Sequence, residues 1–175
     1  MSELRTPRLR LEALTEEHAD ELFDGLRDER LYEFVPSIAP SDLKGLRSRL
    51  RSLESRTSPD GSERWLNWAI RCLDVGRCIG YVQATVPVNA PAKIAYVLFA
   101  PFWGLGYGHE AVVGLLDFLS TALQVREIRA SVDPDNCRSI ALLERLGFRR
   151  IAVHRDADTI RGVLRDEIEY ALIRL

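Results

Sequence analysis

Blocks of apolar and polar residues follow one another along the chain at strand or helix spacing, with turn residues between them. Arg8–Leu14 alternates polar and apolar side chains, which indicates a half-buried strand. Two helices are expected next, because apolar residues recur at helical spacing behind the capping candidates Thr15 and Ser41. The apolar faces consist of Ala19, Leu22, Phe23 and Leu26 in the first helix and of Leu43, Leu46, Leu50 and Leu53 in the second.

The middle of the chain contains three strand-like segments and a helix that follows a glycine-rich turn. Trp65–Leu73 and Cys78–Val86 are separated by a short turn and predict a hairpin. Ile94–Ala100 is a third apolar run of strand length. Glycine then occupies every second position between Trp103 and Gly108. Apolar residues recur at helical spacing behind this turn, namely Ala111, Val112, Leu115, Phe118, Leu119 and Ala122.

The last third of the chain predicts one helix among three strands. A strand is expected over Glu127–Asp133, followed by a helix that ends at Leu146 with Gly147 as its C′ residue. Two strands, at about 148–155 and 166–173, should follow around a polar turn near 158–162. The succession of elements predicts one α/β domain over residues 1–175, with a mixed sheet and helices on both faces.

Length and charge exclude several classes of protein. A chain of 175 residues can bury about 70% of its unfolded surface, so it needs no disulfide framework. The net charge of −2 gives no support for non-specific binding to nucleic acid or membranes. The basic second helix, with Lys44, Arg47, Arg49 and Arg51, is interpreted as a solvated surface. Without a leader or a long apolar run, the protein is expected to be soluble and cytoplasmic.

The cysteines indicate neither a disulfide framework nor a metal site. Cys72, Cys78 and Cys137 have no recognisable zinc spacing, although the first two could approach each other across the hairpin. We expect all three to be small buried residues in a reducing compartment, and no metal is expected.

The glycine turn is the first candidate for chemistry. A turn between a strand and a helix exposes backbone N–H groups where the helix dipole favours negative charge. Glycine at 104, 106 and 108 would let a phosphate approach the main chain closely. A merely structural turn is the alternative. The Walker loop is excluded because its lysine is missing, and GxGxxG fails at His109. The looser GxGxxA form fits Gly106 to Ala111, but the acidic residue that it requires should end the next strand, whereas Glu127 begins it.

Two motifs resemble the GNAT superfamily of acetyl-CoA-dependent N-acetyltransferases. Trp103-x-x-Gly106-x-Gly108 is similar to the motif Gln/Arg-x-x-Gly-x-Gly/Ala, with tryptophan first as in the RimJ/RimL-like branch. The string from Asn136 to Phe148 resembles Asn-x-x-Ser followed by Lys/Arg-Leu-Gly-Phe. The opening Thr6-Pro7-Arg8-Leu9 also looks like the start of RimJ/RimL-type chains. The resemblance thus covers nearly the whole chain.

The resemblance implies a fold and a co-substrate. In GNAT proteins the strands that correspond to Ile94 and Glu127 are parallel but splay apart, and the gap admits the pantetheine arm of acetyl-CoA. Main-chain contacts with that arm are then expected at Val97 and Leu98. The pyrophosphate is expected on the N–H groups of the turn. The residues of that turn are Gly104, Leu105, Gly106, Tyr107, Gly108 and His109.

The implied reaction is direct transfer of the acetyl group to a primary amine. Many GNAT enzymes protonate the CoA thiolate with a tyrosine, whose position here is Leu143. RimL-type chains suggest Ser139 instead, with Asn136 beside it as helix cap and cofactor contact. Asp133 and Glu33 are the candidates for the base that deprotonates the amine.

The acceptor cannot be named from the sequence. A protein N-terminus or a small amine is expected, no membrane partner is expected, and a homodimer is compatible with the sequence. A catalytically silent acetyl-CoA-binding or sensory module is the alternative function. A third hypothesis, an RNA-associated protein that uses the arginine helix, predicts binding that collapses with salt.

Overall fold

The computed structural model describes residues 3–174. Its helices are α1 (Ala19–Leu26), α2 (Leu43–Leu53), α3 (Tyr107–Thr121) and α4 (Cys137–Arg145). Its strands are β1 (Leu4–Arg5), β2 (Leu9–Ala13), β3 (Glu63–Cys72), β4 (Arg77–Pro87), β5 (Ala92–Leu98), β6 (Glu127–Val132), β7 (Arg149–Ile160) and β8 (Val163–Ile173). This succession agrees with the predicted one, apart from the short β1 at the start.

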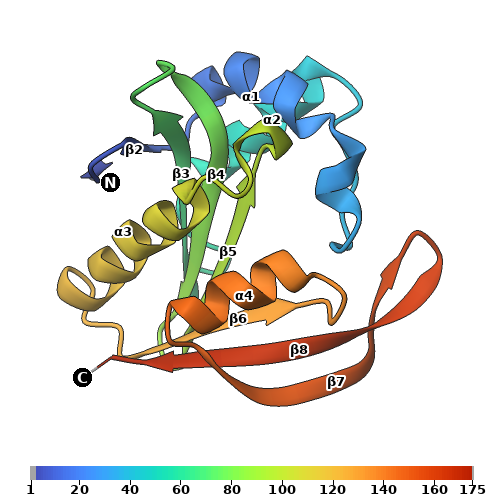
Figure 1. Cartoon of the computed structure of the whole chain (residues 1–175). Coiled ribbons are helices and arrows are strands. Elements are labelled where there is room, and N and C mark those ends of the chain that lie inside the picture. Colours follow the sequence, from blue (N-terminus) through green and yellow to red (C-terminus); the bar gives the residue numbers. More distant parts are fainter. Residues whose placement is uncertain (1–2, 175) are drawn as a thin grey trace.

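The strands form one sheet in the order β1-β2-β3-β4-β5-β6-β8-β7 (Figure 1). Neighbouring strands are antiparallel, except that β5 and β6 run parallel and are joined through α3. The predicted mixed, mostly antiparallel sheet is therefore confirmed. Among the helices of residues 3–174, none is both long and apolar enough to cross a membrane.

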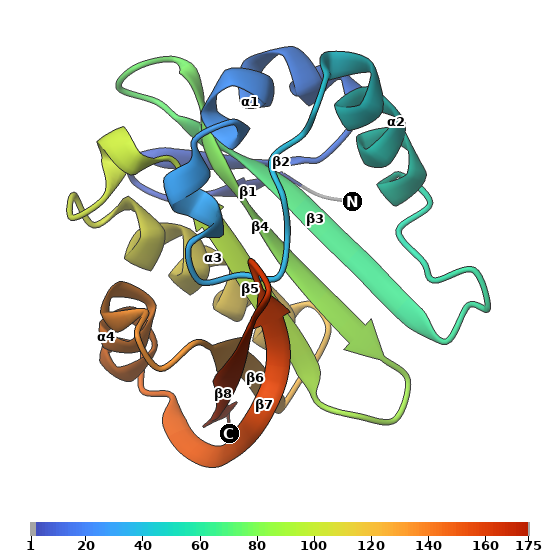
Figure 2. The same cartoon turned by 90° about the vertical axis from the view of Figure 1, so that its right-hand side faces the viewer.

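Helices cover both faces of the sheet, as predicted. Figure 2 shows α1 and α2 in front of β2, β3 and β4, with α3 behind them. On the α3 face, the buried Trp68 ring packs edge-on against Phe118 at 5.4 Å between centroids. On the other face, the Arg71 guanidinium on β3 pairs with Glu21 of α1 at 2.9 Å. Successive strand residues point to opposite faces, so β3 contributes to both layers.

The parallel pair β5 and β6 separates soon after it starts. Ala92 pairs with Ile128 and Lys93 with Arg129, and these two pairs are the whole register between the strands. From Ile94 onward, β5 stays paired only with β4 on its other side. The expected splay of the central parallel strands is therefore present. It leaves the inner edge of β5 free of a neighbouring strand, which opens a site.

Several predicted element ends were wrong, each for a local reason. Asp42 caps α2 in place of Ser41, because its carboxylate accepts the N–H of Gly45 at 2.7 Å. A 3-10 turn follows Thr15, so α1 begins only at Ala19. The predicted polar turn near 158–162 shrinks to two residues, since β7 and β8 pair as far as Ile160 and Val163. The C′ position of Gly147 is confirmed by its φ of 87°.

Candidate active site

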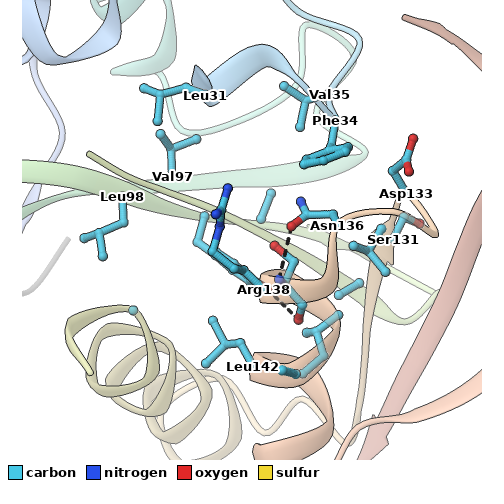
Figure 3. A pocket seen from close by; sticks show the side chains of 18 of the residues that line it. Leu31, Phe34, Val35, Val97, Leu98, Ser131, Asp133, Asn136, Arg138 and Leu142 are labelled. Carbon is cyan, nitrogen blue, oxygen red and sulfur yellow. Dashed lines mark hydrogen bonds between the residues drawn. The ribbon is translucent and has the colours of Figure 1, made fainter. Parts of the chain in front are cut away.

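A cleft of about 470 Å³ occupies the gap between β5 and β6. Its walls are the ends of these two strands, the glycine turn before α3, the first turns of α4 and residues 30–36 (Figure 3). In the close view, Leu31, Phe34 and Val35 lie on the side opposite Leu142. The C-terminal hairpin completes the lining with Asp158, Ile160, Arg165, Asp166 and Glu167.

Unused N–H groups gather where the glycine turn meets α3. Gly106 is the N-cap residue, and the Gly106 carbonyl accepts the N–H of Glu110 at 3.1 Å. Over the described part of the chain, no acceptor receives the N–H groups from Gly104 to His109. These groups add to the positive end of the helix dipole, so the turn suits a bound anion such as a diphosphate.

The three glycines of the turn all line the cleft but differ in backbone conformation. Gly104 and Gly106 have φ of 75° and 83°, a region that favours glycine. Gly108 has ordinary helical geometry, and a Cβ there would touch Leu142 at 3.7 Å and Leu98 at 3.9 Å. Both neighbours line the cleft. A side chain at Gly108 would therefore lie against two residues of the cleft lining.

The first turn of α4 presents the second predicted motif to the cleft. Asn136 caps the helix, because its side-chain oxygen accepts the N–H of Ser139 at 3.2 Å. Both residues line the cleft. The hydroxyl of Ser139 interacts with the phenol of Tyr96 on β5 and lowers the pKa of that phenol, so the two hydroxyls lie together in the cleft. The structure thus places Ser139 in the lining of the cleft, in the first turn of α4, with its hydroxyl beside a phenol.

A tyrosine that the sequence analysis missed lies beside Ser139. Tyr96 of β5 lines the cleft, and its hydroxyl lies 3.5 Å from the Ser139 carbonyl, at the limit of a hydrogen bond. Burial raises the pKa of this phenol to about 12, so it stays protonated at neutral pH. Leu143, at the position of the tyrosine expected on α4, is only 1% exposed. The phenol that lines this cleft therefore belongs to Tyr96 of β5, whereas the GNAT resemblance pointed to one on α4.

On β5, the backbone N–H and C=O groups of Leu98 face the cleft, whereas those of Val97 face β4. A Cβ on Gly80 would meet the Val97 carbonyl oxygen at 2.0 Å, so that oxygen points toward β4. The Phe99 N–H donates to the Ile79 carbonyl on the same side. Backbone groups alternate along an antiparallel strand, which turns those of Leu98 toward the cleft. The Val97 side chain still lines the cleft.

Trp103 departs from the Gln/Arg that GNAT motifs carry, and the structure shows what holds its ring. The indole N–H donates to the Leu98 carbonyl at 2.6 Å. The guanidinium of Arg138, in the first turn of α4, lies over the ring at 4.1 Å. Trp103 therefore connects β5, the glycine turn and α4 at the edge of the cleft and leaves only the N–H of Leu98 for a ligand.

Neither predicted base fits the cleft well. Asp133 is 5% exposed, and both of its carboxylate oxygens accept hydrogen bonds from Arg165 at 2.8 Å. Burial by itself raises the pKa of Asp133, but the Arg165 and Asp135 N–H groups outweigh it and the net shift is downward. Glu33 is exposed and does not belong to the lining of the cleft, although Phe34 beside it does.

Two other carboxylates line the cleft and were missed. Asp158 of β7 and Glu167 of β8 have no hydrogen-bond or ion-pair partner in the described chain, whereas Asp166 is paired with Arg155. The sequence analysis placed residue 158 in a loop and gave no reason to bring it near Asn136. Their place in the lining follows from the length of the β7–β8 hairpin, whose strands extend beyond the predicted ends at residues 155 and 166.

A second cavity of about 260 Å³ adjoins the cleft under residues 37–42. Its floor includes Tyr81 and Gln83 of β4. These residues pair with Val97 and Ala95, which line the main cleft, so the two cavities share the β4–β5 pair. Leucines of α1 and α2 form the apolar wall, namely Leu22, Leu26, Leu46, Leu50 and Leu53.

The cysteines only partly meet expectation. Cys72 and Cys78 are buried and free, but Cys137 is exposed at the start of α4. Cys78 also lies within 4.8 Å of Glu12 and His18 in ligand-atom distance. Arg71 donates to both oxygens of Glu12, at 2.8 and 3.0 Å. A metal ion bound by these three residues would have to compete with this guanidinium for the Glu12 carboxylate.

Comparisons with known proteins agree with this fold. Residues 8–149 match the family described as Acetyltransferase (GNAT) domain. The uncharacterised N-acetyltransferase p20 of Bacillus licheniformis is 29% identical over 176 residues, which cover 99% of this chain and 97% of p20. Among solved structures, the ribosomal L7/L12 alpha-N-protein acetyltransferase RimL, in complex with coenzyme A, has a TM-score of 0.86 at 20% identity over 98% of both chains. RimJ of Mycobacterium smegmatis, in complex with CoA-disulfide, has a TM-score of 0.84 at 22% identity over 98% of this chain and 86% of RimJ.

Proposed function

The chain belongs to the GNAT acetyltransferase family, and from that premise we propose that its cleft transfers an acetyl group from acetyl-CoA directly to a primary amine. One observation carries the proposal. The unused N–H groups of the glycine turn lie at one end of the same cleft that the splayed strands open. A diphosphate can bind at the turn while the pantetheine arm extends between β5 and α4.

The residues around the gap suit the bonds that must form and break. The amine nitrogen attacks the thioester carbon, and negative charge develops on the thioester oxygen. The Leu98 N–H faces the cleft and can donate to that oxygen. The C–S bond then breaks, and the CoA thiolate leaves toward α4. There the Ser139 hydroxyl, and the Tyr96 phenol beside it, can donate hydrogen bonds to the sulfur.

The acceptor amine must lose a proton before it attacks, because amines are mostly protonated at neutral pH. Asp158 and Glu167 line the cleft from the C-terminal hairpin and are free of ion-pair partners in the described chain. Their negative charge attracts an ammonium group, and either carboxylate can take its proton directly or through water. We therefore assign the base to this pair of carboxylates in place of Asp133 and Glu33.

The second cavity suggests how the rest of the acceptor is held. It lies next to Val97 and Ala95 under residues 37–42, on the α1–α2 side of the sheet. A cavity of about 260 Å³ exceeds the 150 Å³ that holds a benzene ring in an apolar protein interior. We propose that it takes an apolar side chain next to the reacting amine. RimL acts on a protein N-terminus, and a peptide N-terminus with a bulky first residue would fit this arrangement.

A screen of amines and peptides tests the proposal. Purified protein, acetyl-CoA and each candidate acceptor are mixed, and free CoA thiol and acetylated acceptor are measured together. The proposal expects both products in equal amounts with at least one primary amine. Tight binding of CoA without turnover on any acceptor would favour the alternative function, a silent acetyl-CoA-binding module. That alternative is based on the buried Leu143, which stands at the position of the proton-donating tyrosine.

A further inference from the structure

Arg8 connects the start of the chain to the start of α3. The Arg8 backbone N–H donates to one oxygen of the Glu110 carboxylate at 2.7 Å, and its Nε donates to the other at 2.7 Å. The Thr6 hydroxyl donates to Glu110 as well, at 2.6 Å. The Glu110 side chain is 15% exposed, so these charge-assisted bonds are partly shielded from water. Together they fix the position of the Arg8 guanidinium.

The fixed guanidinium lies against the outer side of the glycine turn. Its Nη1 donates to the Leu105 carbonyl at 3.1 Å, and its carbon lies 4.3 Å from the centre of the Tyr107 ring. A Cβ on Gly106 would meet Nη2 at 3.3 Å. Gly104, Gly106 and Gly108 line the cleft, whereas Arg8 does not. The turn therefore lies between Arg8 and the cleft.

Peptide geometry links this contact to the anion site. The carbonyl of Leu105 and the N–H of Gly106 belong to one planar trans peptide unit, so they point in opposite directions. A carbonyl held toward Arg8 directs the Gly106 N–H away from Arg8, to the side of the cleft. We infer that Arg8 is a positioning residue for the co-substrate. By holding the Leu105 carbonyl outward, it orients the Gly106 N–H toward the diphosphate of acetyl-CoA, an inference that rests on the proposed function.

The chemistry of arginine explains why the position needs this side chain. One guanidinium reaches Glu110 through Nε and Leu105 through Nη1 at once, because its donors form a rigid fork. A lysine would keep the positive charge, but its single ammonium cannot hold both partners in this geometry. Glycine at 106 leaves the Leu105–Gly106 peptide free to rotate, so an external partner is needed to fix it.

Two variants of Arg8 separate orientation from charge. Arg8→Lys keeps the charge and loses the fork, and Arg8→Gln loses both. We expect each to raise the Kd for CoA about tenfold, the loss of one well-oriented hydrogen bond to a charged ligand. With acetyl-CoA as donor, KM should rise while kcat at saturation stays the same. With S-acetylpantetheine, which lacks the diphosphate, kcat/KM should not change. Arg10→Gln is the matched control, since Arg10 pairs with Glu12 away from the turn and should leave every value unchanged.

The outcomes distinguish this inference from the proposed function. If the wild-type protein binds no CoA, the proposed function itself fails. If the wild-type binds CoA and a folded Arg8→Lys binds it equally well, charge alone suffices and the inference is wrong. An equal loss with S-acetylpantetheine would also overturn it, because the change would then have distorted the whole cleft. Thermal melting identifies a variant that fails to fold, and Glu110→Gln, which frees the guanidinium without removing it, then takes its place and should raise the Kd for CoA.

Discussion

Asp133 and Arg165 form a two-pronged ion pair between the end of β6 and β8, with both contacts at 2.8 Å. The Asp133 side chain is 2% exposed and the Arg165 side chain 29%, so the pair is largely shielded. It holds the C-terminal hairpin against the end of β6, where the cleft opens. A carboxylate bound in this way is a structural group and a poor base.

The first prediction concerns this pair. Asp133→Asn should lower the free energy of unfolding by about 1–3 kcal/mol at pH 7, because the Arg165 guanidinium loses its buried charged partner and keeps only the exposed Asp135. The turnover per folded molecule should change little. Urea unfolding and a turnover assay check the two parts. A large loss of kcat in a stable variant would return Asp133 to the list of bases.

The pH dependence of this effect has a definite sign. The pKa of Asp133 is lowered in the folded protein, so its contribution to stability is present above the unfolded pKa, near 4. That contribution disappears as the pH falls through the lower folded pKa. The difference in unfolding free energy between wild-type and Asp133→Asn should therefore shrink as the pH falls from about 5 to about 3. A constant difference over this range contradicts the linkage.

The second prediction compares two glycines with positive φ. Gly106→Ala and Gly76→Ala should cost similar backbone strain, on the order of 1 kcal/mol, because their φ angles are 83° and 68°. Only Gly106 belongs to the turn beside the cleft. Calorimetry should therefore show weaker CoA binding for Gly106→Ala and unchanged binding for Gly76→Ala. Equal affinities would mean that the turn does not contact the co-substrate.

The third prediction concerns the two hydroxyls beside the departing thiolate. Ser139→Ala should lower kcat about 10- to 100-fold with little effect on acetyl-CoA binding, since the hydrogen bond strengthens in the transition state. Tyr96→Phe should have an effect of the same kind. If both hydroxyls serve one sulfur, the double variant will lose less than the product of the two single losses. Full kcat in both single variants would assign protonation to water.

The fourth prediction tests the base. Of Asp158→Asn and Glu167→Gln, one should lower kcat/KM for the amine about 100-fold or more, because the amine then has no base. The other should mainly raise KM for the amine, because it only attracts the ammonium group. Wild-type kcat/KM values in both variants would place the base outside this pair.

The sequence predicted features that depend on neighbouring residues better than features that depend on residues far apart in the chain. The glycine turn, the cap at Asn136 and the C′ residue Gly147 were predictable, because each depends on residues within one or two helical turns. The ends of β7 and β8 were not. The sequence there is polar, and its strands are stabilised by pairing along a long hairpin.

The features that the sequence could not reveal join distant residues. The pairing of Asp133 with Arg165 spans 32 residues, and that of Arg8 with Glu110 spans 102. No local pattern distinguishes these carboxylates from solvated ones, so the sequence could not show that Asp133 is ion-paired. Likewise, the alternation that turns Leu98 toward the cleft depends on the pairing of β5 with β4.

The central claim is that the cleft between β5 and α4 transfers acetyl groups, and one paired measurement tests it most directly. Wild-type and Gly108→Val are assayed side by side for CoA thiol release and acceptor acetylation, since a valine would lie against Leu98 and Leu142 of the cleft lining. We predict equal amounts of thiol and acetylated amine from the wild-type protein and a loss of both from the folded variant. Equal turnover by the two proteins would contradict the account, because the reaction would then proceed outside this cleft.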